Sequence, residues 1–448
     1  MKRALHIALE VVLLSSLAAC NSATRSAAGG DKEDVNPGDR KILGVPSPYP
    51  ADPSLRARQD ELDASMAARR QVAWATVRKV LEPIPLADPR IPSGGVVPTV
   101  PRFQTWYAKD DFVRMWKELY QELGSDGRKA RAPLPSTAVD AIFDWNAHMV
   151  DALPTWPADR YAAYVAHLTT DEDWMAEGAG HRVSYSPAVM THVFGNYGRV
   201  LGCMNGIDAI APEAPPLAPD NFTSCFDSEF PVGAAVVKAQ WRRAELGFTL
   251  PTFDTSEAAL QQRFDATADW AVPTTSDGTD DPGADRIHTV RLPNGNVYRL
   301  VGLHVITKEL RKWLWVTMWW APDGDGDFGA DRPADLEADP IFRHYKMCVV
   351  TAHDERDPAQ PPGPTWCSNP YLERGAGNAR TNCIGCHQHG GTSLLPETII
   401  GDETRFPANG RTEVRANFPT DYSWALTRED SLARVITDEV AYYDSFEK

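Results

Sequence analysis

Apolar residues recur every three or four positions along several stretches of the N-terminal half, which is the spacing of one buried face of a helix. Pro83 and Gly124 follow two of these stretches, and Ser186-Pro187 opens another, as is typical of helix ends and starts. The pattern predicts helices over residues 58–81, 110–123, 139–153 and 187–201. We therefore expect residues 58–228 to form a mainly helical region.

Beyond Cys225 the apolar positions alternate, and this period indicates strands. The pattern predicts strands over residues 286–292, 296–306 and 312–321, with the first two joined as a hairpin through Pro293-Asn294-Gly295. Both faces of the third strand are apolar, which indicates a central, covered strand. Residues 234–241 fit a strand or a helix, and a last helix is expected over 428–446. Residues 229–448 are thus predicted to be β-containing, and the fold class to be α+β.

The N-terminus is typical of an export signal. Lys2 and Arg3 precede a short apolar run that is too short to span a bilayer. The ending Leu17-Ala18-Ala19-Cys20 resembles the bacterial lipobox, in which the cysteine is lipidated; an ordinary secretory signal with an incidental cysteine is the alternative. The resemblance implies a signal peptide over residues 1–19, a lipid anchor on Cys20 and, with Asn21 next, an outer-membrane lipoprotein facing the periplasm. Residues 20–57 are then expected to be a flexible tether.

The charge balance argues against one class of partner. Lys plus Arg number 45 and Asp plus Glu 61, which gives a net charge of -16 over 448 residues. No basic cluster interrupts this balance, so a polyphosphate surface would be repelled. We therefore expect no nucleic-acid binding.

Seven cysteines divide into three groups. Cys20 belongs to the lipobox, and two others, Cys383 and Cys386, belong to the motif described next. The remaining four form an even number, as expected for disulfides in an exported protein. The pairing of nearest neighbours predicts Cys203–Cys225 and Cys348–Cys367, and the alternative is four buried thiols.

The strongest chemical signal is Cys383-Ile384-Gly385-Cys386-His387, a C-x-x-C-H motif. This spacing is the signature of covalent c-type haem attachment, because one helical turn presents both thiols to the porphyrin vinyl groups and the imidazole to the iron. A thioredoxin-like pair would open a long helix, whereas Gly390-Gly391 follows here. A zinc site would need two further close ligands. The motif predicts one haem c, with thioethers at Cys383 and Cys386 and His387 as the proximal ligand.

Several segments together resemble bacterial c-type cytochromes, and in particular a group of largely uncharacterised single-haem proteins. They are Cys367-Ser368-Asn369-Pro370-Tyr371, the motif with its flanks from Asn382 to His389, Gly302-Leu303-His304-Val305-Ile306-Thr307-Lys308 and Trp313-Leu314-Trp315-Val316-Thr317. The resemblance covers about the last half of the chain and implies haem binding but no established reaction. Met318-Trp319-Trp320 departs from the acidic and histidine residues expected there.

The distal iron ligand is not evident from the motif, because no methionine follows His387. The candidates nearest upstream are His304, Met347, His344 and Met318, of which His304 and Met347 are preferred. Alternation places His304 on one strand face with Gly302, where a flat macrocycle could approach closely. Core packing is the alternative role for both side chains.

A six-coordinate iron is suited to electron transfer, and an open iron to ligand binding or catalysis. The leading hypothesis is a membrane-anchored cytochrome c that carries electrons in the periplasm to or from an unidentified redox partner protein. The alternatives are a haem-c enzyme, such as a peroxidase-like one, or a small-ligand sensor. The order of a strand, Lys308, a tryptophan-rich strand and C-x-x-C-H is also similar to that in β-sheet haem-c proteins that oxidise hydroxylamine, and this similarity implies that Lys308 approaches the porphyrin edge. No catalytic set can be named, so enzymatic activity stays open.

One acidic loop has the alternating carboxylates of a calcium site, Asp323-Gly324-Asp325-Gly326-Asp327, with Asp331 beyond it. Phe328 stands where such loops have glycine, and Ala334 where they have a bidentate glutamate. The sequence therefore favours a solvated acidic turn over bound calcium.

Overall fold

The computed structural model of the chain describes residues 46–85, 99–131, 134, 157, 179–206, 225–244, 249–256, 258–259, 276–291, 297–351, 367–373, 383–391, 418–426 and 432–447. The predictions for the signal peptide, for Cys20, for most of the tether and for a helix over 139–153 lie outside these residues, as does the predicted turn at 293–295.

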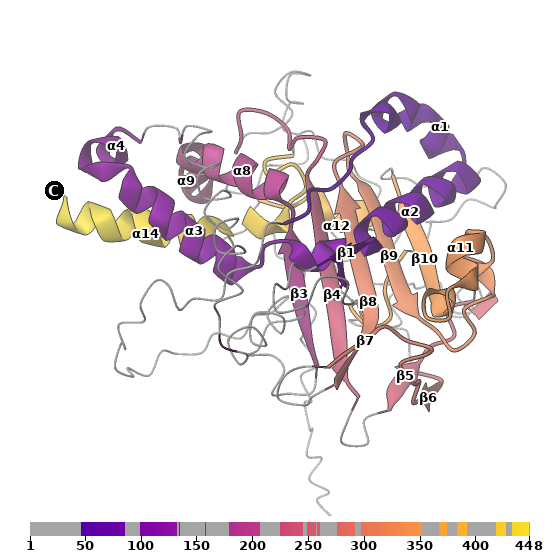
Figure 1. Cartoon of the computed structure of the whole chain (residues 1–448). Helices are drawn as coiled ribbons and strands as arrows, with labels where there is room; N and C mark the ends of the chain where they lie inside the picture. The colour runs from indigo at the N-terminus through magenta and orange to yellow at the C-terminus, as the bar shows by residue number, and fades with distance from the viewer. Residues whose placement is uncertain are drawn as a thin grey trace, which may run out of the picture.

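A six-stranded antiparallel sheet lies at the centre of the described chain (Figure 1). Its order is β10-β9-β8-β4-β3, and β7 also pairs with β8, which confirms the antiparallel pairing of the two strands of the predicted hairpin. The strands are β3 (Ala179–Tyr185), β4 (Ala235–Arg243), β7 (Thr289–Arg291), β8 (Val297–Thr307), β9 (Leu314–Trp320) and β10 (Tyr345–Val350).

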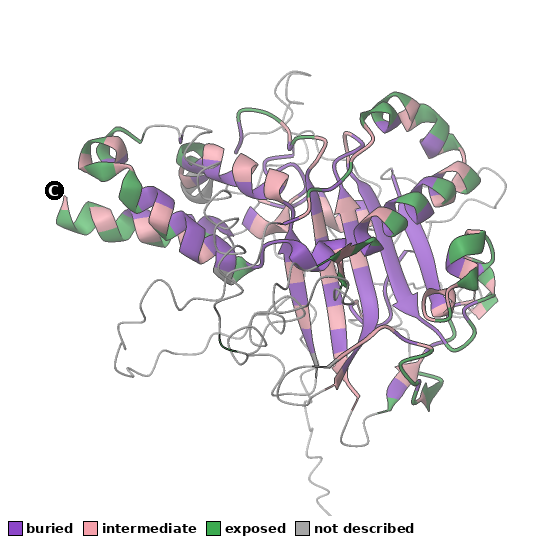
Figure 2. Ribbon diagram, viewed as in Figure 1, coloured by how far each residue is buried: buried purple, intermediate pink, exposed green. Residues whose placement is uncertain are grey.

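Strand β9 is buried over its whole length, as its two apolar faces predict. Strand β4 instead alternates between buried and intermediate residues, and Figure 2 shows this alternation along the ribbon. The segment that fitted either a strand or a helix is therefore a strand. Strand β3 was not predicted from the sequence. It is an edge strand of seven residues, and it comes from the region expected to be mainly helical.

The predicted helices that fall within the described residues are present, but two of them are divided. Ser65 is extended and accepts a hydrogen bond from Ala68, so it ends one helix and caps the next. Asn196 separates the other pair. The helical elements here are a 3-10 turn at Pro53–Arg58, α1 (Gln59–Ala64), α2 (Met66–Leu81), α8 (Pro187–Gly195) and α9 (Tyr197–Gly206).

Ser186 does not cap α8 with its side chain, although its position before Pro187 suggested this role. Its hydroxyl accepts a hydrogen bond from the backbone N–H of Ala235 at 2.9 Å. The serine therefore joins the start of α8 to the start of β4.

A helical layer lies beside the sheet (Figure 1). Trp116 stacks with Tyr120 and with Phe194 in its interior, and Tyr443 meets Tyr120 edge to face. An ion pair between Arg128 and Glu447 joins α4 to the end of α14. Its helices, besides α8 and α9, are α3 (Lys109–Glu122), α4 (Gly124–Ala130) and α14 (Leu432–Phe446).

Short elements complete the described fold. They are the pairs β1 (Pro83–Pro85) with β2 (Thr99–Pro101) and β5 (Leu250–Thr252) with β6 (Gly278–Asp280), the helices α11 (Ala334–Ala338) and α12 (Cys383–His387), and the 3-10 turns Arg102–Thr105, Asp327–Gly329, Phe342–His344 and Trp424–Leu426. Helices and an antiparallel sheet in separate layers make this an α+β protein.

Helix α2 crosses one face of the central sheet (Figure 1). Glu309, which follows β8, accepts hydrogen bonds from Thr307 on that face and from Lys79 of α2. Directly paired residues of neighbouring strands share a face, and successive residues alternate between faces. Thr307 and His304 therefore lie on opposite faces of β8.

Candidate functional site

We call the sheet face opposite α2 the histidine face. Its central row runs through the paired residues Lys238 of β4, His304 of β8, Thr317 of β9 and Cys348 of β10. Trp315, two residues before Thr317, lies on the same face. The segments 367–373, 383–391 and 418–426 contact this face through the bonds described below.

The C-x-x-C-H motif forms α12, a helix of five residues. Within this helix Ile384 and Gly385 are buried, while Cys383 and Cys386 are of intermediate exposure and are not in a disulfide. Residues three apart in a helix lie on the same side, so the two thiols share one edge of the turn. A single turn is the arrangement that the following Gly390-Gly391 predicted.

His387 is held from two sides. Its Nδ1 lies 3.1 Å from the carbonyl oxygen of Tyr422, and its ring centroid lies 4.4 Å from that of Trp315. Burial, opposed by the bond to Tyr422 and assisted by the positive charge of Lys238, lowers the pKa of His387 to about 4. The imidazole is therefore neutral at pH 7, with Nδ1–H donated to the carbonyl and Nε2 unprotonated, a nitrogen that could bind a metal ion.

The Tyr422 carbonyl belongs to a loop of unusual backbone conformation. Asp421 and Tyr422 have φ values of 49° and 68°, in the left-handed region that non-glycine residues rarely adopt. The carboxylate of Asp421 lies 2.6 Å from Nζ of Lys308 and accepts a hydrogen bond from the backbone N–H of Phe230 at 2.9 Å. Burial raises the pKa of Asp421 to about 6, and the charge of Lys308 opposes this rise.

Lys308 is thus assigned to a buried ion pair. Both its side chain and that of Asp421 have no exposed surface. The sequence analogy with hydroxylamine-oxidising proteins had Lys308 approach a porphyrin edge, but its ammonium group is directed at Asp421 and at the carbonyl of Arg311. The structure therefore supports an ion-pairing role for this lysine.

His304 presents an imidazole to the same space as His387. Burial, and after it the positive charge of Lys238, lower the pKa of His304 to about 3. Its Nε2 atom is buried and has no hydrogen-bond partner within the part of the chain that the structure describes. The nearest carboxyl oxygen, Oε2 of Glu373, lies 3.7 Å away, and burial raises the pKa of Glu373. The neutral imidazole therefore lies beside a buried carboxyl group and keeps an unsatisfied nitrogen.

The segment 367–373 covers part of the histidine face. Cys367 forms a disulfide with Cys348, as predicted. Asn369 then donates hydrogen bonds to Oγ1 of Thr317 at 3.0 Å and to the carbonyl of Met318 at 2.6 Å. A Cβ atom on Gly302 would lie 2.9 Å from Oδ1 of Asn369. Asn369, and not a macrocycle, is therefore what approaches Gly302, which corrects the sequence interpretation of this glycine.

The other distal candidates are not on this face. Met347 pairs with Met318, one residue away from the Cys348–Thr317 pair, so alternation directs both methionines to the opposite face. His344 ends a 3-10 turn before β10, at the far end of that strand from Val350, which pairs with Trp315. The register therefore favours His304, which lies on the face that α12 contacts, over Met347 as the distal candidate.

Cys225 is also disulfide-bonded. The side chain of Cys203, its predicted partner, lies outside the described residues, so this pairing stays a prediction. The backbone N–H of Cys225 donates to the carbonyl of Pro419 at 2.9 Å. This bond joins the segment before β4 to the loop that carries Asp421.

The acidic loop is held by ion pairs. Asp323 lies 3.0 Å from Nζ of Lys346, Asp325 lies 3.6 Å from Arg332 and from Arg343, and Asp331 binds Arg70 at 2.6 Å. These carboxylates are directed at different cations and not at one centre. Among the described residues, no group of three or more His, Cys, Asp or Glu could hold a metal ion.

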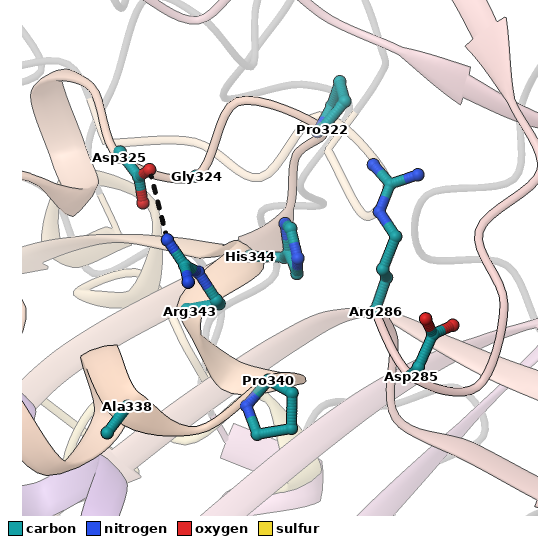
Figure 3. Close-up of a pocket in the computed structure, with 9 residues that line it drawn as sticks. All are labelled: Asp285, Arg286, Pro322, Gly324, Asp325, Ala338, Pro340, Arg343 and His344. Atoms are coloured by element: carbon teal, nitrogen blue, oxygen red, sulfur yellow. Dashed lines mark ion pairs between the residues drawn. The ribbon is translucent and has the colours of Figure 1, made fainter.

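A surface pocket of about 420 Å³ lies beside this loop (Figure 3). Arg286 and Arg343 line it, but Arg343 is paired with Asp325 across its wall, as the dashed line shows, and Arg286 is paired with Asp280 at 3.2 Å. The pocket lies at the Trp320 end of β9, five residues or about 17 Å from Trp315. It is separate from the histidine face site.

Sequence reasoning missed four contributors to the site: Lys238, Glu373, Asp421 and Tyr422. Tyr422 acts through a backbone carbonyl, which has no side-chain signal. The need of Lys308 for a buried counter-charge could have suggested an acidic partner, but not which of 61 acidic residues supplies it.

No family model matches the chain, and neither a curated protein nor a solved structure is similar to it. No helix in the described ranges has both the length and the apolar character needed to cross a membrane.

Proposed function

We propose that the protein is a c-type cytochrome that binds one haem at α12 and transfers single electrons. The observation that carries this proposal is the joint geometry of α12: two thiols on one edge of a single helical turn, followed directly by a neutral imidazole whose Nδ1 is fixed by Tyr422. Cys383 and Cys386 would hold the haem by thioether bonds, and Nε2 of His387 would bind its iron.

The residues around α12 fit such a group. Buried His304 has a nitrogen without a partner among the described residues, and it lies on the sheet face that α12 contacts. A haem supplies one-electron chemistry at an iron whose reactivity its axial ligands set. We propose His304 as the distal ligand, because a buried, neutral and unsatisfied imidazole is stabilised when it gains a metal bond.

Electron transfer needs no general acid, base or nucleophile from the protein. What the chain must provide is a fixed ligand pair and a rigid, water-poor surrounding. Trp315 and Trp424 contact the His387 ring, and the disulfide at Cys348 fixes the segment that borders His304. These contacts support a carrier role.

Attachment to a membrane is part of the proposal. The lipobox-like ending at Cys20 supports an exported lipoprotein on the periplasmic face of an outer membrane, joined by a tether to the folded part. The described chain binds the end of this tether firmly, since Tyr49 donates a hydrogen bond to buried Glu309 at 2.8 Å. The redox partner protein would then be one that reaches the same compartment.

A second candidate function is a haem enzyme or small-ligand sensor with an open distal face. Glu373 favours it, because a carboxyl of raised pKa lies 3.7 Å from the distal imidazole and could exchange a proton with a bound ligand. In this case His304 would lie beside the ligand and would not bind iron.

Carbon monoxide separates the two. The full chain is expressed in a host that matures cytochromes, reduced, and exposed to carbon monoxide while its visible spectrum is recorded. A carrier with two strong axial ligands leaves the Soret band in place, whereas a large Soret shift at low carbon monoxide would favour the enzyme or sensor. A protein without any haem absorbance would end both.

A further inference from the structure

We propose that Lys308 and Asp421 are positioning residues for His387: their buried ion pair holds the Asp421–Tyr422 backbone so that the Tyr422 carbonyl accepts the Nδ1–H of the proximal imidazole. The inference rests on the proposed function, since it concerns how a haem-binding histidine is tuned. It assigns a role to two residues that lie outside the C-x-x-C-H motif.

The ion pair is fully enclosed. Nζ of Lys308 lies 2.6 Å from Oδ1 of Asp421, and neither side chain is exposed. The other carboxylate oxygen of Asp421 accepts the backbone N–H of Phe230 at 2.9 Å. The pair holds the Asp421 carboxylate in place, because without Lys308 this carboxylate would be an uncompensated buried charge.

The tryptophan beside the pair fixes the backbone as well as the side chain. Nε1 of Trp313 donates to the carbonyl oxygen of Asp421 at 2.8 Å and approaches its carboxylate at 3.2 Å. The ammonium group of Lys308 lies 5.4 Å from the Trp313 ring centroid, within the range of a cation–π contact. Carbonyl, carboxylate and ammonium are thus bound in one cluster.

The left-handed conformation makes this cluster necessary. Asp421 and Tyr422 both have positive φ values, 49° and 68°, and neither is glycine. Residues keep such a conformation only when surrounding contacts over-determine it. This conformation directs the carbonyl oxygen of Tyr422 at His387, where it lies 3.1 Å from Nδ1. The ion pair is therefore connected to the histidine through one residue, because Tyr422 directly follows Asp421.

The hydrogen bond at Nδ1 affects the metal-binding nitrogen. A donor bond from Nδ1–H to a carbonyl fixes the tautomer and raises the basicity of Nε2, which stabilises the oxidised metal. Loss of the ion pair would release the strained backbone, weaken this bond and raise the reduction potential of the haem.

A neighbouring acid permits a clean variant. Oε2 of Glu229 lies 3.2 Å from Nζ of Lys308 and is itself paired with Arg56 at 2.8 Å. In Asp421→Asn the lysine therefore keeps one carboxylate partner, and the amide oxygen can still accept a hydrogen bond from Phe230. This variant should fold even where Lys308→Met does not.

The matched control is Lys346→Met. Lys346 is another buried lysine, 1% exposed, and lies 3.0 Å from Asp323 at the opposite end of β10 from the site. Its removal also takes a charge from the sheet interior, but it is not connected to the 418–426 loop. It reports what a merely structural loss does to the haem.

The test uses the full-length, haem-loaded chain. Reduction potentials are measured by optical redox titration, and exchange of the hyperfine-shifted Nδ1 proton of His387 is followed by NMR of the oxidised protein. Asp421→Asn and Lys308→Met should raise the potential and speed the proton exchange, while Lys346→Met should leave both at the wild-type values. Equal shifts in all three variants, or none, would overturn the inference. A wild-type chain that binds no haem would instead reject the proposed function itself.

Discussion

Nδ2 of Asn369 lies 3.0 Å from Oγ1 of Thr317, the β9 residue that pairs with His304. The backbone N–H of Asn369 in turn donates to Oε2 of Glu373 at 2.6 Å, and that oxygen lies 3.7 Å from Nε2 of His304. A continuous set of contacts therefore leads from the Cys348–Cys367 disulfide to the distal imidazole. The side of the site opposite α12 is fixed by covalent and hydrogen bonds, and this makes its residues testable one at a time.

His304→Ala should convert the reduced haem protein from one that resists carbon monoxide to one that binds it, because it removes the proposed distal ligand. Visible spectra with and without carbon monoxide measure the change. Met347→Leu is the control, since Met347 lies on the opposite sheet face, and its spectrum should match the wild type. An unchanged spectrum in His304→Ala would exclude His304 as a ligand.

Gly302→Ala should lower the free energy of unfolding by about 1–3 kcal/mol, the usual cost of overpacking a filled interior. Its Cβ would lie 2.9 Å from Oδ1 of Asn369, which cannot move away without losing the bond to the backbone N–H of Tyr371 at 3.0 Å. Denaturant titration measures the cost. In an Asn369→Ala background the same substitution should cost much less, and equal costs in the two backgrounds would show that Asn369 is not the obstacle.

The strands were predictable where their pattern is determined by burial alone. Trp313 to Ala321 has apolar residues on both faces, which only a covered central strand explains, and β9 is buried throughout. Strand β3 was not predictable in this way, since its sequence Ala-Gly-His-Arg-Val-Ser-Tyr has little apolar content. Buried Arg182 in β3 is accommodated through a hydrogen bond to the carbonyl of Trp106 at 2.8 Å, a tertiary contact that no local pattern encodes.

The candidate site divides in the same way. The motif Cys383 to His387 could be recognised from the sequence alone, because its spacing and residue types are enough to predict haem attachment. The choice between His304 and Met347 needed the sheet register, since a shift of one residue changes the face. Tyr422 could not be found at all, because its contribution is a carbonyl oxygen directed by an unusual backbone conformation.

Glu309→Gln should reduce the free energy of unfolding by about 3 kcal/mol, as expected when one partner of a buried ion pair is removed. Its carboxylate has no exposed surface and accepts hydrogen bonds from Tyr49 at 2.8 Å, from the backbone N–H of Asp52 at 2.7 Å and from Lys79 at 2.8 Å. An amide would turn one acceptor into a donor that faces these donors.

Limited trypsin digestion gives a local reading of the same change. Cleavage after Arg56 and Arg58 should become faster in Glu309→Gln, because the segment that Glu309 binds is loosened. Asp335→Asn breaks an exposed ion pair with Arg78 and should leave the digestion unchanged. Protection of the segment in Glu309→Gln equal to the wild type would contradict this assignment.

Acidification should weaken the fold through His288. Burial lowers the pKa of His288 to about 4, below its unfolded value of 6.5, so the unfolded chain takes up the proton first as the pH falls. The resulting stabilisation is complete above pH 6.5 and is lost between pH 6.5 and about 4; between pH 7 and pH 5 the loss amounts to about 2 kcal/mol. Denaturant titrations at these two pH values should show a smaller difference for His288→Leu than for the wild type. The same difference in both proteins would show that His288 is not responsible.

The most direct test of the account is the intact mass of the mature chain, purified from a host that attaches haem c. The account predicts that one haem is added covalently, that the peptide containing Cys383 and Cys386 carries it, and that a Cys383→Ala, Cys386→Ala double variant lacks it. A wild-type chain whose mass is that of the polypeptide and its amino-terminal modification alone, with both thiols of α12 still able to react with an alkylating reagent, would contradict the account.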